Sequence, residues 1–162
     1  MVIQFVDNNA YLIKTKEMEI MAGNPTTAGS LPLSGPGEYE VGDVRIQGFT
    51  GAYLFSAEDM NILYVDNSRG LSDQVVKQIE EDIDILLLAL DTDTAHVREA
   101  VKFVNDLDPK IAIPAVEDAT HPFCKEIGGC QPAIPELKVS KKDLVEEARK
   151  VVILHARSRS RK

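Results

Sequence analysis

The sequence predicts an α/β layered domain in which an antiparallel β half precedes a half of alternating helices and strands. Residues 2–66 show the period-two alternation of strands, interrupted by short runs of turn residues. From residue 72 the apolar residues repeat with helical spacing, and the helical segments alternate with continuous apolar runs typical of strands buried on both faces. This change of period near mid-chain predicts the fold class.

In the first half, "VIQFV", "AYLIKT" and "MEIMAG" are expected to be strands, with Asp7–Asn9 as a turn. Asn24–Gly37 is dense in Gly, Pro, Ser and Thr and is expected to be a loop. Three further strands are expected in "YEVGDVRIQGF", "AYLFSAE" and "MNILYVD", with hairpin turns at Gly42–Asp43 and Glu58–Asp59.

In the second half, Ser72 is expected to cap a helix that runs to Glu81. "DIDILLLAL" follows as a buried strand. The next helix is expected to begin at Thr92 or Thr94 and to end at Asp108-Pro109. Its predicted core-facing residues are Val97, Ala100, Val101, Val104 and Leu107.

"KIAIPAV" is the next predicted strand, and "VVILHA" is the last. Between them, Ser140 and Asp143 resemble a capping box for a third helix, Ser140–Lys150. These elements form one predicted domain, residues 1–156, followed by a basic and disordered tail, residues 157–162.

The charge and cysteine content exclude several classes of protein. The 162 residues carry a formal net charge of -8, which argues against nucleic acid as the main partner. The last six residues, "RSRSRK", carry four positive charges, so residues 1–156 sum to -12. No apolar run is long enough to span a bilayer, so no membrane partner is expected. With two cysteines a disulfide framework is not expected, and the predicted location is cytoplasmic.

"SGPGEYEVGDVRIQG", Ser34–Gly48, resembles a run found in small bacterial and archaeal zinc-dependent hydrolases of the metallo-β-lactamase superfamily. The order of "NILYVDNSRGLSDQVVKQI", "DIDILLLAL" and "VREAVKFVNDLDPKIAIPAV" is similar to the same family. The resemblance implies an αββα sandwich, here truncated, with metal ligands on loops along one edge. It also implies zinc, held by imidazoles and carboxylates so that a bound water ionises near neutral pH.

The ligands for that zinc are missing from this chain. The family carries most of them in a His-x-His-x-Asp-His motif before the Ser-Gly-Pro-Gly turn. Here Pro25 and Ser34 are joined by eight residues, Thr26–Leu33, and none is His, Asp or Glu. The family's late His falls on Val116, and its loop carboxylate on Asp66 or Asn67. We therefore expect no catalytic residue, no metal site and no cofactor.

Other candidate residues have a structural explanation beside the functional one. Asp91 and Asp93, near His96, are suited to a hard cation at the end of a buried strand. The favoured interpretation is that Asp93 or Thr94 caps the following helix. Ser34 lacks a recognisable base, and "SGPG" is expected to be a structural turn.

"VEDATHPFCKEIGGC" gathers several residue types that bind metals or react as nucleophiles, namely Glu117, Asp118, His121, Cys124 and Cys130. His121 and the two cysteines provide three zinc ligands without a fourth. No partner is identifiable for His121 as an acid–base or for Cys124 as a nucleophile. A loop with buried or incidental thiols is favoured.

Two functions remain open at this point, and a third option is that the chain is one half of a larger assembly and does little alone. The leading hypothesis is a pseudoenzyme with a structural or protein-binding role, acting through self-association or a protein partner. Its physical basis is that loss of a helix-bearing segment uncovers apolar strand surface, which is typical of interfaces. The alternative is a divergent metal-dependent hydrolase with a rebuilt carboxylate site that uses Asp66, Asp91, Asp93 and Glu117.

Overall fold

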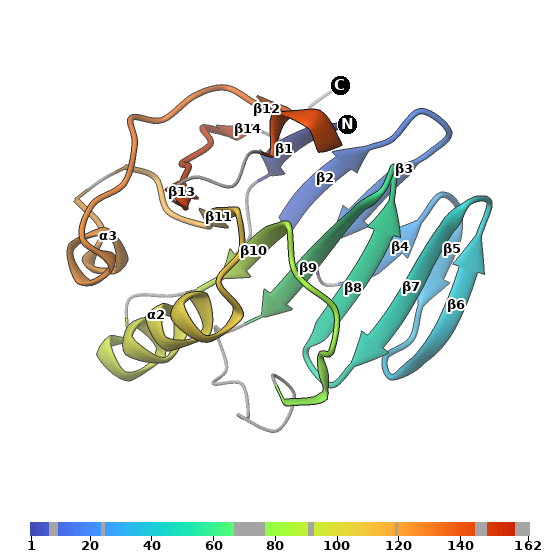
Figure 1. Cartoon of the computed structure of the whole chain (residues 1–162), viewed down its shortest axis with the longest axis horizontal. Helices are drawn as coiled ribbons and strands as arrows, with labels where there is room; N and C mark the ends of the chain where they lie inside the picture. Colours follow the sequence, from blue (N-terminus) through green and yellow to red (C-terminus); the bar gives the residue numbers. More distant parts are fainter. Residues whose placement is uncertain are drawn as a thin grey trace.

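The computed structural model describes residues 1–6, 10–23, 25–66, 77–90, 93–118, 120–144 and 149–157. These residues form two β-sheets packed face to face, with helices against one of them (Figure 1). Sheet A contains β1 (Val2–Val6), β2 (Ala10–Lys14), β3 (Glu19–Ala22), β4 (Thr26–Ala28), β5 (Leu31–Leu33), β12 (Leu137–Lys138) and β14 (Ala156–Arg157). Its strand order is β12-β1-β2-β3-β4-β5, and β14 also pairs with β1.

Sheet B contains β6 (Gly37–Val41), β7 (Val44–Phe49), β8 (Ala52–Ala57), β9 (Met60–Asp66), β10 (Ile85–Ala89), β11 (Ile111–Pro114) and β13 (Lys150–Val151). Its strand order is β13-β11-β10-β9-β8-β7-β6. The strands β6 to β9 pair antiparallel as consecutive hairpins, whereas β9, β10, β11 and β13 pair parallel. This division of the sheet agrees with the change of period in the sequence.

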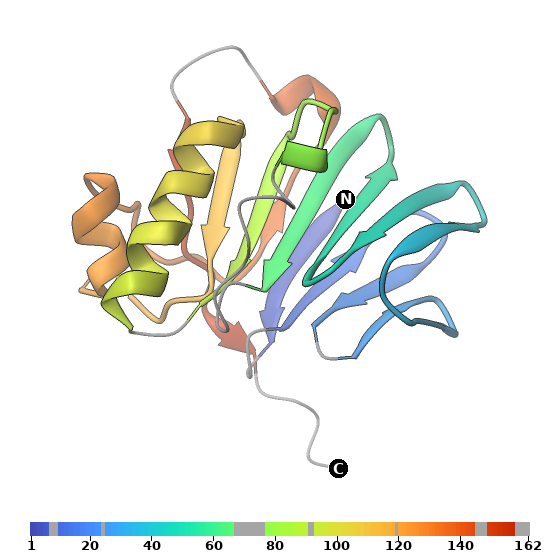
Figure 2. The same ribbon diagram turned by 90° about the horizontal axis from the view of Figure 1, so that it is seen from below.

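Two apolar cores follow from the alternation of side chains along the strands. The larger lies between the sheets and contains fully buried residues such as Ile13, Ile46 and Ile62. The smaller lies between sheet B and the helices α2 (Thr94–Leu107) and α3 (Pro122–Ile127). Figures 1 and 2 show both helices on the same side of the molecule.

The predicted second helix is confirmed. Asp93 is its N-cap, with a carboxylate that accepts hydrogen bonds from the N–H groups of Ala95 and His96. The helix ends at Asp108, which adopts the left-handed conformation. The buried face also includes Phe103, which the predicted stripe omitted.

The predicted loop Asn24–Gly37 is wrong in part, because Thr26–Leu33 forms the β4–β5 hairpin. Residues 72–76 of the predicted helix Ser72–Glu81 lie outside the described residues, and its predicted end is wrong, because helical conformation ends at Gln78. The predicted turn Asp7–Asn9 also lies outside them.

The last third of the chain departs from prediction at two places. The capping box of Ser140 and Asp143 is confirmed, but it opens a single 3-10 turn, Lys141–Asp143, and Lys150 belongs to β13 instead of a helix. The predicted strand "VVILHA" is divided between β13, a bridge from Leu154 to Ile134, and β14. The division arises because this segment moves from sheet B to sheet A.

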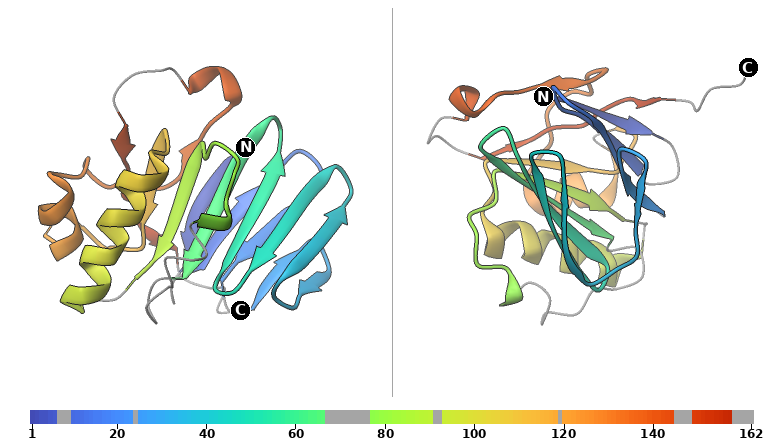
Figure 3. Two further views of the ribbon diagram at one scale, coloured as in Figure 1. Left: turned by 60° about the horizontal axis from the view of Figure 1, so that its bottom comes forward. Right: turned by 90° about the vertical axis from the view of Figure 1, so that its right-hand side faces the viewer.

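The described helices cover sheet B alone. The right-hand view of Figure 3 shows the strands β1 to β5 on the side facing away from α2, with no described helix over them. The expected αββα arrangement has four layers. The described residues form three of them: the helices, sheet B and sheet A. No helix in this part of the chain is long and apolar enough to cross a bilayer.

Candidate functional site

The Ser-Gly-Pro-Gly turn is fixed by two tyrosines that hold one peptide unit. The Gly35 N–H donates to the Tyr53 hydroxyl at 2.7 Å, and the Tyr39 hydroxyl donates to the Gly35 carbonyl at 2.9 Å. Gly35 and Gly37 have φ angles of 104° and 141°, which side-chain-bearing residues rarely adopt. The two glycines thus bring the turn onto the tyrosine hydroxyls.

Gly48 completes this arrangement from β7. A Cβ atom at Gly48 would lie 2.2 Å from the Gly35 carbonyl oxygen and 3.1 Å from the Tyr53 ring. The Gly35 turn therefore rests directly on the backbone of Gly48. The motif from Ser34 to Gly48 is a structural unit, as its glycines and proline predict.

A cavity of about 280 Å³ opens beside this turn, at the edge where the resemblance places metal ligands. It is the natural candidate site because loops from both sheets meet there. Among the described lining residues the polar side chains are few: one carboxylate, two phenols, one threonine and one serine. The lining residues are Gly23, Pro25, Thr26, Leu33, Ser34, Gly35, Gly51, Tyr53, Tyr64 and Asp66.

Two buried phenols, Tyr64 in the lining of the cavity and Tyr11 in the core, stay protonated near neutral pH. Burial raises the pKa of Tyr64 above its ordinary value, and the nearby Asp66 carboxylate raises it further. Burial also raises the pKa of Tyr11, whose hydroxyl lies against the carbonyl oxygens of Leu88 and Ile113, 3.0 and 2.7 Å away. Neither phenol is suited to act as a base or as an anionic metal ligand near neutral pH.

The segment Thr26–Leu33 closes on itself in the place where the family carries its histidines. Its strands pair in register, Thr26 with Leu33 and Ala28 with Leu31. The Thr26 hydroxyl accepts from the Gly23 N–H at 3.1 Å and donates to the Gly23 carbonyl at 2.7 Å, which fixes the start of the hairpin. No side chain in the segment is a histidine or a carboxylate.

The other expected ligand positions do not fit a zinc site either. Val116, the counterpart of the late histidine, is 2% exposed and packs in the core under the helices. Asp66 lines the cavity, and Asn67 lies outside the described residues. Zinc takes three or four nitrogen, sulfur or carboxylate ligands. The described lining of the cavity provides one carboxylate and no imidazole.

The four carboxylates of the alternative site are only partly brought together. Asp66 ends β9 beside Ala89 of β10, and its side chain reaches the cavity. The Asp93 carboxylate caps α2, Glu117 is exposed after β11, and Asp91 lies outside the described residues. In the described part of the chain, no three His, Cys, Asp or Glu side chains converge in a way that suits a metal ion.

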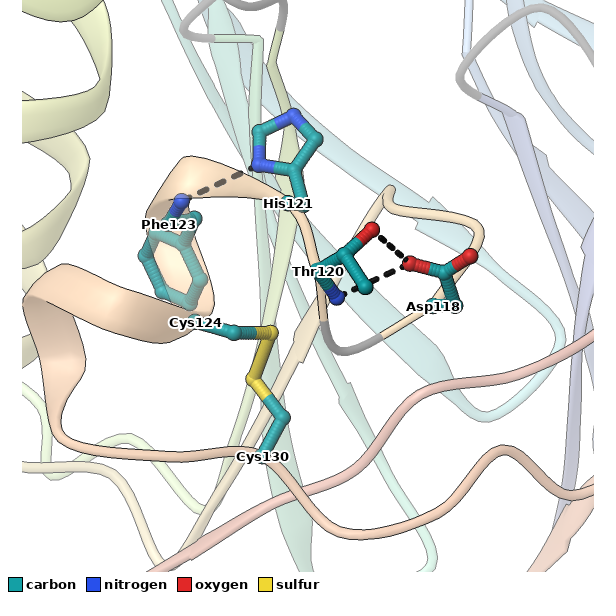
Figure 4. Close-up of a disulfide and its surroundings, with 6 residues drawn as sticks. All are labelled: Asp118, Thr120, His121, Phe123, Cys124 and Cys130. Carbon is teal, nitrogen blue, oxygen red and sulfur yellow. Dashed lines mark hydrogen bonds between the residues drawn. A yellow bond between two sulfur atoms is a disulfide. The ribbon is translucent and has the colours of Figure 1, made fainter.

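Figure 4 shows the segment that carries the cysteines. Cys124 and Cys130 form a disulfide, so the prediction of incidental thiols is wrong. The reason is local geometry: α3 ends at the left-handed Gly128, the chain reverses, and the two Cα atoms come within 5.4 Å. His121 caps α3, with its Nδ1 atom accepting from the Phe123 N–H at 3.0 Å.

A buried polar cluster at the opposite end of sheet B was not predicted. Asp84 is 6% exposed and accepts from the Asn61 N–H at 2.8 Å. Lys141 lies 3.4 Å from the same carboxylate. This cluster ties the start of β10 to β9 and to the 3-10 turn, which gives it a structural role. The acidic residue inside the apolar run "DIDILLLAL" was the available signal.

Comparisons with known proteins give a similarity of fold. No family model and no curated protein matches the sequence. A solved structure of a proposed Zn-dependent hydrolase of the metallo-β-lactamase superfamily, from Thermotoga maritima, superposes with a TM-score of 0.69 at 18% identity. The match covers 96% of this chain and 99% of that one, so this short form of the fold is not confined to the present protein. The chain therefore has the metallo-β-lactamase fold, as the Ser34–Gly48 motif predicts.

Proposed function

We propose that this chain is a non-hydrolytic protein of the metallo-β-lactamase fold that works by binding protein. The observation that carries the proposal is the β4–β5 hairpin. It joins Pro25 to Ser34 with eight residues that pair with each other and contain no metal-binding side chain. Its uncharged residues stand where the resembled hydrolases hold most of their zinc ligands.

The chemistry of the cavity supports the same conclusion. Zinc-dependent hydrolysis requires a metal held tightly enough to ionise its water. The described lining of the cavity provides the Asp66 carboxylate and the phenols of Tyr53 and Tyr64. A single carboxylate with neutral oxygen donors gives weak binding of a hard cation and does not suit zinc.

The remaining predictions follow from this proposal. The net charge of -8 favours a protein over nucleic acid as the partner. Location in the cytoplasm stays a prediction. The disulfide between Cys124 and Cys130 does not favour that location, because disulfides persist in oxidising compartments. The alternative hydrolase would need Asp91 beside Asp66, with Asp93 and Glu117 released from their present positions.

Metal content separates the two functions. The protein is purified without chelator, and zinc, manganese and iron are measured by inductively coupled plasma mass spectrometry. We expect well under 0.1 metal ion per chain, and no change in the Asp66→Asn variant. About one metal ion per chain in the wild type, lost in Asp66→Asn while circular dichroism shows a folded protein, would overturn the proposal.

A further inference from the structure

On the outer face of sheet A, Gln4, Val6 and Ala10 are buried, whereas the neighbouring Leu12 and Met21 form a partly exposed apolar centre. Side chains at alternate positions point away from the main core, and Leu12 and Met21 belong to neither core. They lie directly opposite each other on β2 and β3 and are partly exposed. The same cross-strand row continues through Gln4 on one side and Thr27 on the other.

Charges beside this row are balanced. Lys14 and Glu19 lie opposite each other in the next outward row. Near the β12 edge of the sheet, the Glu136 carboxylate accepts a hydrogen bond from the Gln4 side chain at 2.7 Å. Lys138 of β12 pairs with Val2 and lies on the same outer face. Among the side chains that the structure describes on this face, Lys14 and Lys138 balance Glu19 and Glu136, although the whole protein has a net charge of -8. Two copies can approach through such a face without the repulsion that their net charge imposes elsewhere.

The outer face of β6 and β7 shows the contrast. Glu38, Glu40 and Glu81 surround a hollow of about 460 Å³ in which Arg45 is the one basic side chain among the described lining residues. Like charges would oppose each other if two copies met there.

The sheet edges are less suited to association than this face. Pro32 lies in the middle of the edge strand β5, where it cannot donate to an added strand. The other free edge at this end of the sandwich is β6, on which Glu38 and Glu40 are exposed. Proline and charged residues on an edge strand prevent a further strand from pairing with it.

We propose that the partner of the outer face of sheet A is a second copy of this chain, packed face to face about a two-fold axis parallel to the strands between β2 and β3. This inference rests on the proposed protein-binding function and identifies its partner. The axis divides the path β12-β1-β2-β3-β4-β5 into equal halves of three strands. Each half packs on the other half of the second copy.

The two-fold axis turns cross-strand neighbours into contacts between copies. Because β2 of one copy lies over β3 of the other, Leu12 meets Met21 and Lys14 meets Glu19, each twice. Among the described residues, Lys14 and Glu19 form no ion pair within the chain, so their charged groups are available to the second copy. The described charges on these two strands are therefore self-complementary.

The size of the face predicts weak association. The six strands of the path are two to five residues long, and with about 4.8 Å between strands and about 3.3 Å per residue they cover roughly 350 Å² on each copy. Stable protein interfaces bury about 800 Å² on each partner. The dimer is therefore expected to form at micromolar concentrations and to exchange rapidly.

Sedimentation equilibrium between about 5 and 500 µM tests the proposal, with charge reversals as variants. Lys14→Glu and Glu19→Lys each place like charges opposite each other, and each is expected to raise the dissociation constant at least tenfold. The double variant Lys14→Glu/Glu19→Lys recreates both pairs and is expected to return to within about threefold of wild type. Gln47→Glu, which also adds a negative charge on a strand but on sheet B, is the matched control and is expected to leave the constant unchanged.

A wild type that stays monomeric up to 500 µM would overturn the dimer, as would a double variant as weak as the single ones. Circular dichroism of each variant shows whether a loss of association reflects unfolding. A folded monomer that contains no metal overturns this inference alone and leaves a different protein as the partner. Stoichiometric metal lost in Asp66→Asn overturns the proposed function instead, so the two failures are distinguishable.

Discussion

Substituting Gly48 by alanine is expected to displace the Gly35 turn. The added Cβ atom would lie 2.2 Å from the Gly35 carbonyl oxygen, more than 1 Å inside an ordinary contact of about 3.4 Å. Gly48 itself has no positive φ angle, so the backbone at this position tolerates alanine. The whole cost therefore comes from the contact with Gly35.

The expected loss in free energy of unfolding follows from the overpacking at Gly48 and from the hydrogen bonds that the displaced turn loses. Overpacking at a closely packed position costs about 1–3 kcal/mol. Moving the Gly35 peptide also weakens its hydrogen bonds with Tyr53 and Tyr39, each worth about 0.5–1.5 kcal/mol. Alanine in place of glycine restricts the unfolded chain, which offsets about 0.4–1 kcal/mol. We expect Gly48→Ala to lower the free energy of unfolding by about 2–5 kcal/mol, a large part of the total for a domain of this size.

Urea denaturation followed by far-ultraviolet circular dichroism measures the loss, and a double-mutant cycle identifies its cause. Tyr53→Phe alone removes the acceptor of the Gly35 N–H. If the clash already displaces Gly35, the second substitution costs less in the Gly48→Ala background than alone. A Gly48→Ala protein within 0.5 kcal/mol of wild type, or strict additivity with Tyr53→Phe, would refute the reasoning.

Three further predictions concern other parts of the fold. Because burial raises the pKa of Tyr11 and Tyr64 above 10.0, the contribution of these two phenols to the free energy of unfolding should be constant below pH 10 and fall as the pH rises above it. Urea titrations at several alkaline pH values check this, and a Tyr64→Phe protein should show a shallower fall. Asp84→Ala should cost about 2 kcal/mol in the same assay, because a buried N–H loses its acceptor, while Asp84→Asn should cost less. Reducing the bond between Cys124 and Cys130, which are six residues apart, should lower the free energy of unfolding by about 2 kcal/mol, and an unchanged urea midpoint in the presence of a phosphine reductant would contradict it.

The parts of the fold that depend on local periodicity were predictable from the sequence. The helix Thr94–Leu107 follows from an apolar repeat with a cap at Asp93. The strands β10 and β11 follow from continuous apolar runs, and the hairpin turns Gly42–Asp43 and Glu58–Asp59 from residues that tolerate positive φ. In each case neighbours in sequence determine the conformation.

The parts that depend on contacts distant in sequence were not predictable. The strands β4 and β5 contain three residues each, and their composition is that of a loop; pairing of Ile20 with Ala28 makes them part of a sheet. The role of Gly48 depends on Gly35, which approaches it only in the folded protein. The Cys124–Cys130 bond depends on the reversal of the chain after α3, which spacing alone does not show.

The composition of the segment beside the candidate cavity is given by the sequence, whereas the candidate interface depends on the register of the sheet. The shortness of Thr26–Leu33 and the absence of ligands in it are properties of the sequence. The register that places Lys14 opposite Glu19 and Leu12 opposite Met21 is a property of the sheet. A shift of one residue would turn these side chains into the core.

The β4–β5 hairpin links the two proposals. By pairing with β3, it extends sheet A beyond the three strands β1 to β3 and places the boundary between β2 and β3 at the middle of the path. By closing within eight residues, it also leaves no length for a helix that would cover Leu12 and Met21. A longer segment could carry both a His-x-His-x-Asp-His motif and a helix. The motif would add metal ligands at the cavity, and the helix would cover the outer face of sheet A. Under the two proposals, the same short hairpin accounts for a cavity whose described lining has no histidine and for a sheet face on which a second copy can pack.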